Sequence, residues 1–425
     1  MNIDALYELF LQYPSVETDT RKLKKGDIFF ALKGPNFNGN HYLQAAIETG
    51  ASYCIADEAT AYQHERIILV NDSLQTLQQL ARKHRMQFDI PFIAITGSNG
   101  KTTTKELVSE VLSKKYTTYT TFGNLNNHIG VPLTLLRIKK DAAIAVIEMG
   151  ANHQKEIAGY CEYAMPTHGI ITNVGKAHLE GFGGEEGVKK GKGELFDYLR
   201  AHGGVAFIYA DYDYLQDMSR GIQHIISYGE TKGDYTGRVL QDETFLEVTI
   251  TKGAAIPSIQ TQLVGDYNLP NVLTAVCVGK TFHVTDEDIK AALEEYTPSN
   301  SRSQLIQSGS NKIILDAYNA NPSSMKAAIS NFANMEGSNK VLILGGMMEL
   351  GAESIAEHNA VVRLISSHPW EKVVLVGKDY INLPDNFIHF FTSAEAKEWY
   401  RQQDFNDSLL LIKGSRSMQM EKVLE

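Results

Sequence analysis

"PFIAITGSNGKTTTKE" (residues 91–106) places an apolar run before a glycine-rich turn and an amphipathic helical pattern after it. This order is typical of a phosphate site, where backbone N–H groups and a helix N-terminus face phosphate oxygens. The common pattern G-x-x-x-x-G-K-[ST] requires glycine at position 95, but Ile95 stands there and the first glycine is Gly97. The shorter spacing, ending at Gly100, Lys101 and Thr102, argues against the ordinary GTPase and helicase families. The alternative is a turn that only links strand to helix.

The pattern around this stretch predicts a three-domain α/β protein. From residue 92 onward, buried strands such as 142–150 and 169–175 alternate with helical patterns, which is typical of a mostly parallel sheet with covering helices. Residues 1–85 contain a smaller α/β unit. Pro, Ser and Asn cluster at 296–304, and four more apolar strands follow at 312–322, 340–346, 371–379 and 409–416. We therefore expect domains at 1–85, 86–298 and 299–425, the last of them Rossmann-like.

Composition and charge argue against several classes of protein. The 425 residues include 40 Lys+Arg and 50 Asp+Glu, a net charge of −10, which argues against bulk nucleic-acid binding. No apolar run is long enough for a membrane span, and the N-terminus lacks the pattern of a signal peptide. The three cysteines, Cys54, Cys161 and Cys277, are widely spaced, as expected for reduced thiols. We expect a cytoplasmic monomer.

Eight segments, in one order, resemble the ATP-dependent Mur ligases, the amide-forming enzymes of peptidoglycan precursor synthesis. They are TGSNGKTTTK (96–105), NLNNHIGVPLTLL (124–136), IEMGANHQKEI (147–157), ITNVGKAHLEGFGG (171–184), VKKGKGELF (188–196), GDYNLPNVLTA (265–275), LDAYNANPSSMKAAI (315–329) and LLIKGSRSM (410–418). The last two resemble the members that add D-alanyl-D-alanine to UDP-N-acetylmuramoyl-tripeptide (UDP-MurNAc-tripeptide). Residues 18–34 resemble the UDP-sugar-binding domain found in part of the family.

The resemblance implies that ATP phosphorylates the tripeptide carboxylate and that the amine of D-alanyl-D-alanine displaces phosphate from the acyl phosphate. Because every reacting group is anionic, such chemistry needs dense positive charge and metal ions. We expect ATP as substrate and Mg²⁺, in two copies, as cofactor. The ATP contacts implied are Thr96, Gly97, Ser98, Asn99, Gly100, Lys101, Thr102 and Thr103 of the loop, Asn271 near the adenine, and Arg302 and Asp316 from the C-terminal domain.

The expected catalytic residues are Lys101, Glu148, His178 and Lys192. Glu148 ends one parallel strand and His178 follows another, so both approach the sheet edge that carries the loop. Thr102 and Glu148 offer the oxygen ligands that Mg²⁺ prefers, whereas His178 and Lys192 enter the metal set through the resemblance. The resemblance also implies carbamylation of Lys192, which requires a neutral amine first. Without the resemblance, Glu148 reads as a surface carboxylate and His178 as a loop histidine.

The remaining substrate contacts fall into two groups. Asn319, Asn321, Lys413 and Arg416 are expected to serve the peptide substrates, the last two by bringing positive charge to carboxylates. Asp19, Thr20, Arg21, Asn38 and His41 are expected to contact the UDP-sugar, although a turn rich in Asn and Gly is also an ordinary loop.

Two other functions compete with this interpretation. One is a related ligase, either the member type that adds the third amino acid or a folylpolyglutamate synthase. The other is a nucleotide-dependent switch that hydrolyses ATP without joining substrates. A switch would need neither the set Glu148, His178 and Lys192 nor a UDP-sugar domain. The sequence does not distinguish diaminopimelate from lysine at the third position of the tripeptide.

Overall fold

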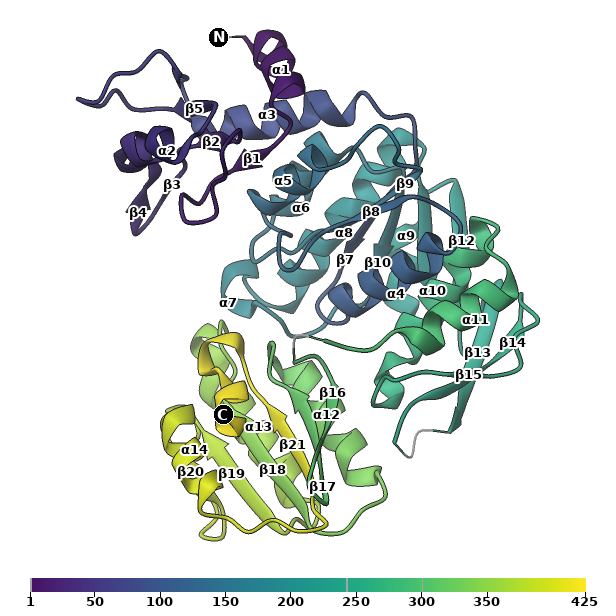
Figure 1. The fold of residues 1–425 in the computed structure, drawn as a ribbon. Helices are drawn as coiled ribbons and strands as arrows, with labels where there is room; N and C mark the ends of the chain where they lie inside the picture. The colour runs from purple at the N-terminus through teal and green to yellow at the C-terminus, as the bar shows by residue number, and fades with distance from the viewer. Residues whose placement is uncertain (1, 242–243, 300) are drawn as a thin grey trace.

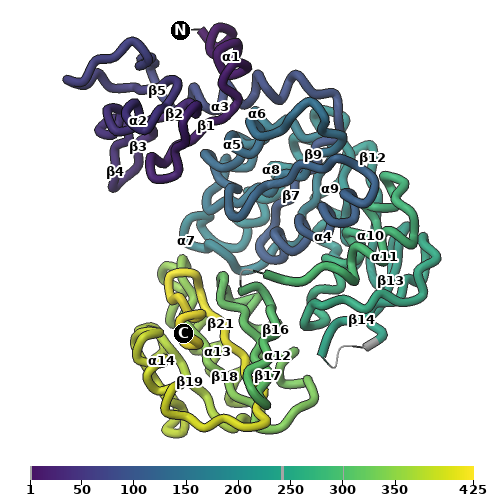
Figure 2. Tube along the Cα trace, viewed as in Figure 1, coloured from purple at the N-terminus to yellow at the C-terminus, as the bar shows by residue number. Residues whose placement is uncertain are grey.

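The computed structural model describes residues 2–241, 244–299 and 301–425, which form three α/β domains in chain order (Figure 1). The tube view shows that the N-terminal domain, in purple to blue, and the C-terminal domain, in green to yellow, both adjoin the central domain (Figure 2). This architecture confirms the predicted fold class, while the domain limits at 85/86 and 298/299 stay predictions. Over the described residues, none of the helices combines the length and the apolar character that crossing a bilayer requires.

The N-terminal domain is built on a four-stranded parallel sheet of order β1-β2-β5-β6. Its strands are β1 (Val16–Glu17), β2 (Ile28–Phe30), β5 (Tyr53–Ala56) and β6 (Ile67–Leu69). A separate hairpin is formed by β3 (Lys33–Gly34) and β4 (Phe37–Asn38). The helices are α1 (Ile3–Gln12), η1 (Gly39–Tyr42), α2 (Leu43–Thr49) and α3 (Ser73–Arg85).

Helix α3 joins this domain to the central one. It begins after Asp72, whose side chain accepts a hydrogen bond from the Gln75 backbone and so satisfies a free N–H of the first turn. At its other end, Arg85 donates to the backbone oxygens of Ala164 and Met165, both at 2.9 Å, and its guanidinium lies 3.6 Å from the Phe92 ring centre. These contacts fix the end of α3 against the central sheet.

The central domain has a nine-stranded sheet of order β15-β14-β13-β12-β11-β10-β7-β9-β8. Its strands are β7 (Phe92–Thr96), β8 (Thr118–Thr120), β9 (Ile144–Glu148), β10 (His168–Ile171), β11 (Val205–Tyr209), β12 (His224–Gly229), β13 (Tyr235–Gln241), β14 (Glu247–Lys252) and β15 (Ile259–Gln260). The strands from β8 to β13 pair in parallel, whereas β13, β14 and β15 pair antiparallel. The helices are α4 (Lys101–Ser113), α5 (Gly130–Leu136), α6 (Glu156–Ala164), α7 (Leu179–Phe182), α8 (Glu185–His202), α9 (Asp213–Ser219), η2 (Asp266–Asn268), α10 (Leu269–Thr281) and α11 (Asp286–Glu295).

The register of the middle strands places the site. Ile95 of β7 is opposite Glu148 of β9, and Thr96 is opposite Ile171 of β10. Strands β7 and β9 are buried along their whole length, which explains their uninterrupted apolar runs. Because all three strands are parallel, the segments that follow them leave the sheet at one edge, as the sequence predicts.

The C-terminal domain has a six-stranded sheet of order β16-β17-β21-β18-β19-β20. Its strands are β16 (Gln304–Ser308), β17 (Asn311–Asp316), β18 (Lys340–Gly345), β19 (Lys372–Val376), β20 (Ile388–Phe390) and β21 (Leu409–Lys413), all parallel except β16. The helices are α12 (Pro322–Asn334), η3 (Gly351–Glu353), α13 (Ser354–Ser366), α14 (Ser393–Arg401), η4 (Arg416–Met418) and η5 (Met420–Leu424). The four apolar strands predicted here are β17, β18, β19 and β21.

Candidate active site

A cavity of about 1040 Å³ lies between the central and C-terminal domains. Both domains contribute predicted site residues to its lining: Ser98, Asn99, Gly100, Lys101, Thr102, Thr103, Glu148, His178 and Asn271 from the first, and Arg302, Asp316, Asn319, Asn321 and Lys413 from the second. The structure therefore brings together residues that are up to 315 positions apart (413 − 98).

The glycine loop has a shape that only glycine allows. Gly97 has φ +146°, and a Cβ there would lie 2.0 Å from Thr172 Oγ1. Gly100, at the start of α4, has φ +78°, where a side chain would be strained. Asn173, directly after β10, braces the turn: its Oδ1 accepts from the Asn99 N–H at 2.9 Å, and its Nδ2 donates to the Asn99 oxygen at 3.1 Å. The short loop is thus held by its neighbour.

Lys101 lies over this loop. Its Nζ donates to the backbone oxygens of Gly97 at 2.7 Å and Ser98 at 3.1 Å. Loss of water around the amine lowers the pKa of Lys101 to about 8, against a partial opposing effect of the Glu148 carboxylate. A phosphate group bound in the cavity would place negative charge beside this amine and so favour its protonated form.

Glu148 is suited to hold a cation. The side chain is 1% exposed, and Oε1 accepts from Thr102 Oγ1 at 3.1 Å and from Asn126 Nδ2 at 2.7 Å. The second oxygen, Oε2, is buried and has no hydrogen-bond partner among the described residues. A buried carboxylate oxygen without a donor is costly unless a cation neutralises it, so Thr102 and Glu148 fit the oxygen ligands of Mg²⁺.

His178 is turned toward the other domain. It has φ +53°, and its Nδ1 is hydrogen-bonded to Glu349 of the C-terminal domain. Among the described residues, no group of three or more His, Cys, Asp or Glu side chains has an arrangement that could hold a metal ion. The metal set of Thr102, Glu148, His178 and Lys192 therefore stays a prediction.

Lys192 is buried behind the cavity on α8, with 1% of its surface exposed. Its Nζ donates to the Ala151 backbone oxygen at 3.0 Å and lies 4.9 Å from the Phe182 ring centre. Burial holds the pKa of the Lys192 amine well below its usual value, and the positive charge of Lys101 adds to this effect. The amine is thus disposed to be neutral.

On the C-terminal side, parallel pairing places Asp316 opposite Lys413 at the ends of β17 and β21. Lys413 Nζ lies 2.6 Å from Asp316 Oδ2 and 3.2 Å from the Asn319 oxygen, and its side chain is buried. The Arg302 guanidinium is stacked 3.4 Å from the Tyr318 ring centre. The positive charge of Lys413 is therefore already paired, whereas Arg302 remains able to meet an anion.

Asn271 and Asn321 hold elements of the cleft together. Asn271 accepts from Thr104 Oγ1 at 3.0 Å, which ties α10 to α4. Asn321 caps α12 with its Oδ1, and its Nδ2 donates to Asn99 Oδ1 of the glycine loop at 2.7 Å. This last bond crosses from one domain to the other.

Other predicted residues lie outside the cavity lining. Thr96 is the last residue of β7 and Gly97 follows it, and Arg416 pairs with Glu421 at 2.9 Å while its side chain stays 63% exposed. In the N-terminal domain, Asp19 and Arg21 pair with each other at 2.7 Å. Whether Arg416 and the N-terminal residues contact substrate stays a prediction.

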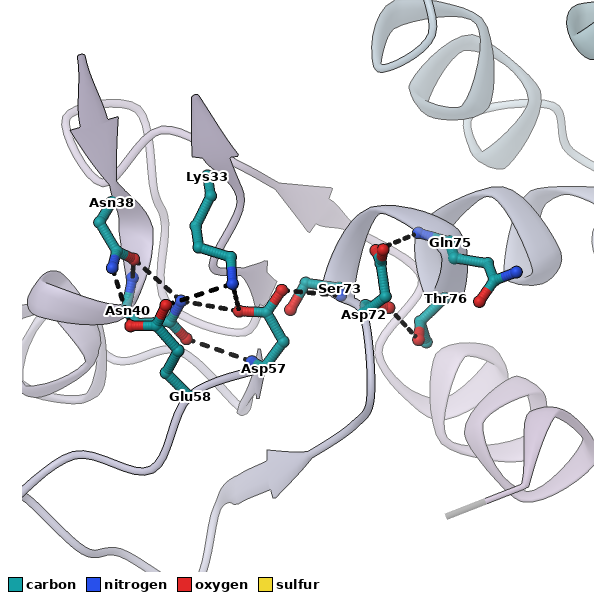
Figure 3. A network of polar contacts seen from close by, with 9 residues as sticks. All are labelled: Lys33, Asn38, Asn40, Asp57, Glu58, Asp72, Ser73, Gln75 and Thr76. Carbon is teal, nitrogen blue, oxygen red and sulfur yellow. Dashed lines mark hydrogen bonds and ion pairs between the residues drawn. The ribbon is translucent and has the colours of Figure 1, made fainter. Parts of the chain in front are cut away.

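The predicted Asn38 belongs to a polar network in the N-terminal domain (Figure 3). It donates to Glu58 Oε2 at 2.8 Å and accepts from the Asn40 side chain at 2.9 Å, and Asn40 in turn donates to Asp57 at 2.9 Å. Lys33 lies within 3.3 Å of both acids. This network fixes the β3–β4 hairpin to the end of β5. Thr20 and His41 lie in the same domain, His41 within η1.

Sequence reasoning missed Asn126 and Asn173, which position Glu148 and the glycine loop. The signal was available, because Asn173 follows an apolar strand directly and Asn126 lies in the asparagine-rich run 124–127.

Three family profiles match the chain: the "Mur ligase family, catalytic domain" over residues 12–85, the "Mur ligase middle domain" over 95–279 and the "Mur ligase, glutamate ligase domain" over 301–416. The chain is 34% identical to UDP-N-acetylmuramoyl-tripeptide--D-alanyl-D-alanine ligase of Bacillus subtilis, covering 96% of this chain and 92% of the relative. It is 36% identical to the protein of that name from Escherichia coli, with the same coverage.

Solved structures agree. The chain is similar to MurF from Acinetobacter baumannii, with a TM-score of 0.88 and 32% identity over 96% of this chain and 92% of that one. It is also similar to MurF ligase from Thermotoga maritima in complex with ADP, with a TM-score of 0.86 and 26% identity over 97% of each chain. The chain belongs to the Mur ligase family.

Proposed function

We propose that the chain is an ATP-dependent ligase that joins the amine of D-alanyl-D-alanine to a carboxylate of UDP-MurNAc-tripeptide. The observation that carries this proposal is the two-domain cleft, in which Lys101 and Glu148 line the same cavity as Arg302 and Asp316. Relatives with this ligase name, aligned over more than nine-tenths of their own length, support the choice of substrates.

In the first step, a carboxylate oxygen of the tripeptide attacks the γ-phosphorus of ATP. The bond between the γ-phosphorus and the β–γ bridging oxygen breaks, and ADP and an acyl phosphate result. The loop N–H groups and Lys101 would hold the triphosphate, because phosphate oxygens are better acceptors for the amine than the loop carbonyls it now contacts. Arg302 would stabilise the transferred charge from the opposite domain.

Thr102 and Glu148 would hold Mg²⁺, with His178 and Lys192 as further expected ligands and two ions as the expected number. Bound Mg²⁺ would neutralise phosphate and carboxylate charge while the two anions approach. The unpartnered Oε2 of Glu148 supports this assignment.

Carbamylation of Lys192 is part of the proposal. The neutral Nζ attacks the carbon of CO₂ and loses one proton, which leaves an N-carboxylate in place of the amine. The lowered pKa of the buried amine favours its neutral form, which is the form that attacks CO₂. The new negative charge would attract the positive charge of Lys101. A buried neutral amine would thus become an anion near the metal site.

In the second step, the neutral amine of D-alanyl-D-alanine attacks the acyl carbon, and phosphate leaves from the tetrahedral intermediate as the amide forms and the nitrogen loses a proton. A closed cleft protects the acyl phosphate from water until the amine arrives. Asn319, Asn321 and Asn271 line this cleft, and we expect Asn271 to contact the adenine.

The N-terminal domain would bind the UDP-sugar through the region of Asp19, Thr20, Arg21, Asn38 and His41. We place the protein in the cytoplasm, the compartment where ATP and UDP-linked precursors are available. We expect it to be a monomer. Cys54, Cys161 and Cys277 are buried free thiols.

Phosphate release from the purified chain with ATP and Mg²⁺ tests the proposal. We expect release only when UDP-MurNAc-tripeptide and D-alanyl-D-alanine are both present. Release that instead requires UDP-N-acetylmuramoyl-dipeptide and a free amino acid would indicate the related ligase that adds the third residue. Steady release without either substrate would indicate the nucleotide-dependent switch and overturn the ligase. Assays with the diaminopimelate and lysine tripeptides identify the third residue.

A further inference from the structure

Lys176 connects the two domains that form the cleft. It lies in the segment after β10, and its Nζ is 2.7 Å from Glu357 Oε1 on α13 of the C-terminal domain. Its backbone N–H donates to Ser323 Oγ on α12 at 3.1 Å. A single residue of the central domain is therefore bonded to two helices of the C-terminal domain.

The same amine has a second carboxylate within reach, in its own domain. Glu185 Oε1, at the start of α8, lies 3.5 Å from Lys176 Nζ. The Glu185 side chain is 63% exposed and that of Glu357 is 13% exposed, so the shorter contact is also the less hydrated one. The hydrogen bond to Glu357 is the main reason why the pKa of Lys176 is raised.

The segment that carries Lys176 also touches the glycine loop. The Gly175 N–H donates to Ser98 Oγ at 3.0 Å, and Ser98 Oγ donates to the Gly175 oxygen at 3.0 Å. The interdomain bond between Asn321 and Asn99 lies on the same loop. A movement of α12 and α13 away from the central domain would therefore break contacts beside the phosphate site.

Substrates must enter and products must leave a cleft between two domains, so the domains have to separate in each turnover. When they separate, Glu357 moves away from Lys176, but Glu185 stays in reach because it belongs to the same domain as the lysine. Opening then exchanges one partner for another and leaves no unpaired cation. Because partly exposed ion pairs contribute little to stability, exchanging one for the other costs little, as a reversible closure requires.

We propose that Lys176 is the positioning residue of a closure latch, which pairs with Glu357 when the cleft is closed and with Glu185 when it is open. The proposal rests on the ligase function proposed above for the role of the closed state. Neither carboxylate acts on the substrate. Their effect is on the fraction of molecules in which Arg302 and Asp316 stand opposite the glycine loop, and the apparent affinity for nucleotide follows that fraction.

The two carboxylates should therefore have opposite effects. We expect Glu357→Gln to raise the KM for ATP by up to about fivefold, the range of a partly exposed ion pair, and Glu185→Gln to lower it. The exchange Lys176→Glu with Glu357→Lys should bring the KM back to the wild-type value or below, because Glu185 would repel the carboxylate introduced at position 176 and so disfavour the open state. Glu186→Gln, which removes an exposed charge one position along α8, is the matched control and should change nothing.

A second measurement does not depend on ligation. X-ray scattering with Mg²⁺ and a non-hydrolysable ATP analogue should give a larger radius of gyration for Glu357→Gln than for the wild type. An unchanged KM and radius in Glu357→Gln, or an unchanged or raised KM in Glu185→Gln, would overturn the latch. A wild type that releases no phosphate with both substrates would instead overturn the ligase function, while scattering would still test closure.

Discussion

Replacing Glu148 by glutamine separates what the buried carboxylate costs in folding stability from what it contributes to metal binding. Glutamine keeps the shape of the side chain and an oxygen that can accept from Thr102 and Asn126. What disappears is a buried negative charge whose Oε2 has no hydrogen-bond partner among the described residues. The folding stability of the free protein should therefore tolerate the change, whereas binding of Mg²⁺ and nucleotide should be lost.

The magnitude follows from this geometry. A buried polar atom without a partner costs about 1–3 kcal/mol, and more when it is charged. The new amide N–H₂ is a buried donor that needs an acceptor of its own, so we count only part of this cost as recovered. We expect Glu148→Gln to raise the free energy of unfolding by about 1–2 kcal/mol, which for a domain of about 200 residues raises Tm by about 2–8 °C.

The assay is thermal unfolding with and without Mg²⁺ and an ATP analogue, alongside phosphate release. Wild-type Tm should rise when metal and nucleotide are added, because they bind only the folded state. Without ligands, Glu148→Gln should have a higher Tm than the wild type. Its Tm should change little when Mg²⁺ is added, and it should release no phosphate. Glu162→Gln, an exposed acid on α6, is the control and should behave as wild type. A Glu148→Gln protein that melts lower, or that keeps its response to Mg²⁺ and its turnover, would refute the reasoning.

Four further predictions follow. Because the pKa of Lys101 is about 8, its amine is about half neutral at pH 8; a bound triphosphate raises that pKa, so binding at pH 8–9 should take up part of a proton. Calorimetry in buffers of different ionisation enthalpy measures this uptake, and equal heats would contradict it. Lys101→Ala should abolish phosphate release with a wild-type-like melting curve, and retained turnover would contradict the loop assignment. Lys413→Met leaves the Asp316 carboxylate unpaired and should lower the free energy of unfolding by about 3 kcal/mol or more, most of it recovered by adding Asp316→Asn; additive losses in urea unfolding would contradict the pairing. Arg416→Ala should mainly raise the KM for the tripeptide, and an unchanged KM would remove this residue from the substrate site.

The sequence was informative wherever a residue follows a strand. The glycine loop after β7 and Glu148 at the end of β9 could be assigned to the cleft, because parallel strands bring their carboxyl ends to one edge. Asp316, at the end of β17 in the other sheet, was assigned through the family resemblance, and it lines the same cleft. Apolar runs and turn residues were enough to predict three α/β domains. These features depend on local pattern and on a general rule of sheet geometry.

Contacts between side chains could not be obtained in the same way. Lys413 is expected to bring positive charge to the substrate, and the sequence gives no sign that the parallel register of β17 and β21 pairs it with Asp316. His178 was expected to face the metal, and its ring is bonded across the cleft to Glu349. Pairing of this kind depends on how two domains meet, and no spacing within either segment encodes that.

Contacts with the segment after β10 explain how the shortened glycine loop is held in place. A loop with fewer residues between its glycines encloses less phosphate by itself, and here the segment after β10 supplies the missing support through Asn173 and Gly175. That segment continues to Lys176, which is bonded to the C-terminal domain. The supports from Asn173 and Gly175 lie within the central domain, and the bonds of Asn99 to Asn321 and of Lys176 to Glu357 link this region to the second domain. In a self-contained phosphate loop, hydrolysis can proceed in one domain alone. Here both domains line the cavity that contains the loop, so we expect the proposed ligation to need the two domains together.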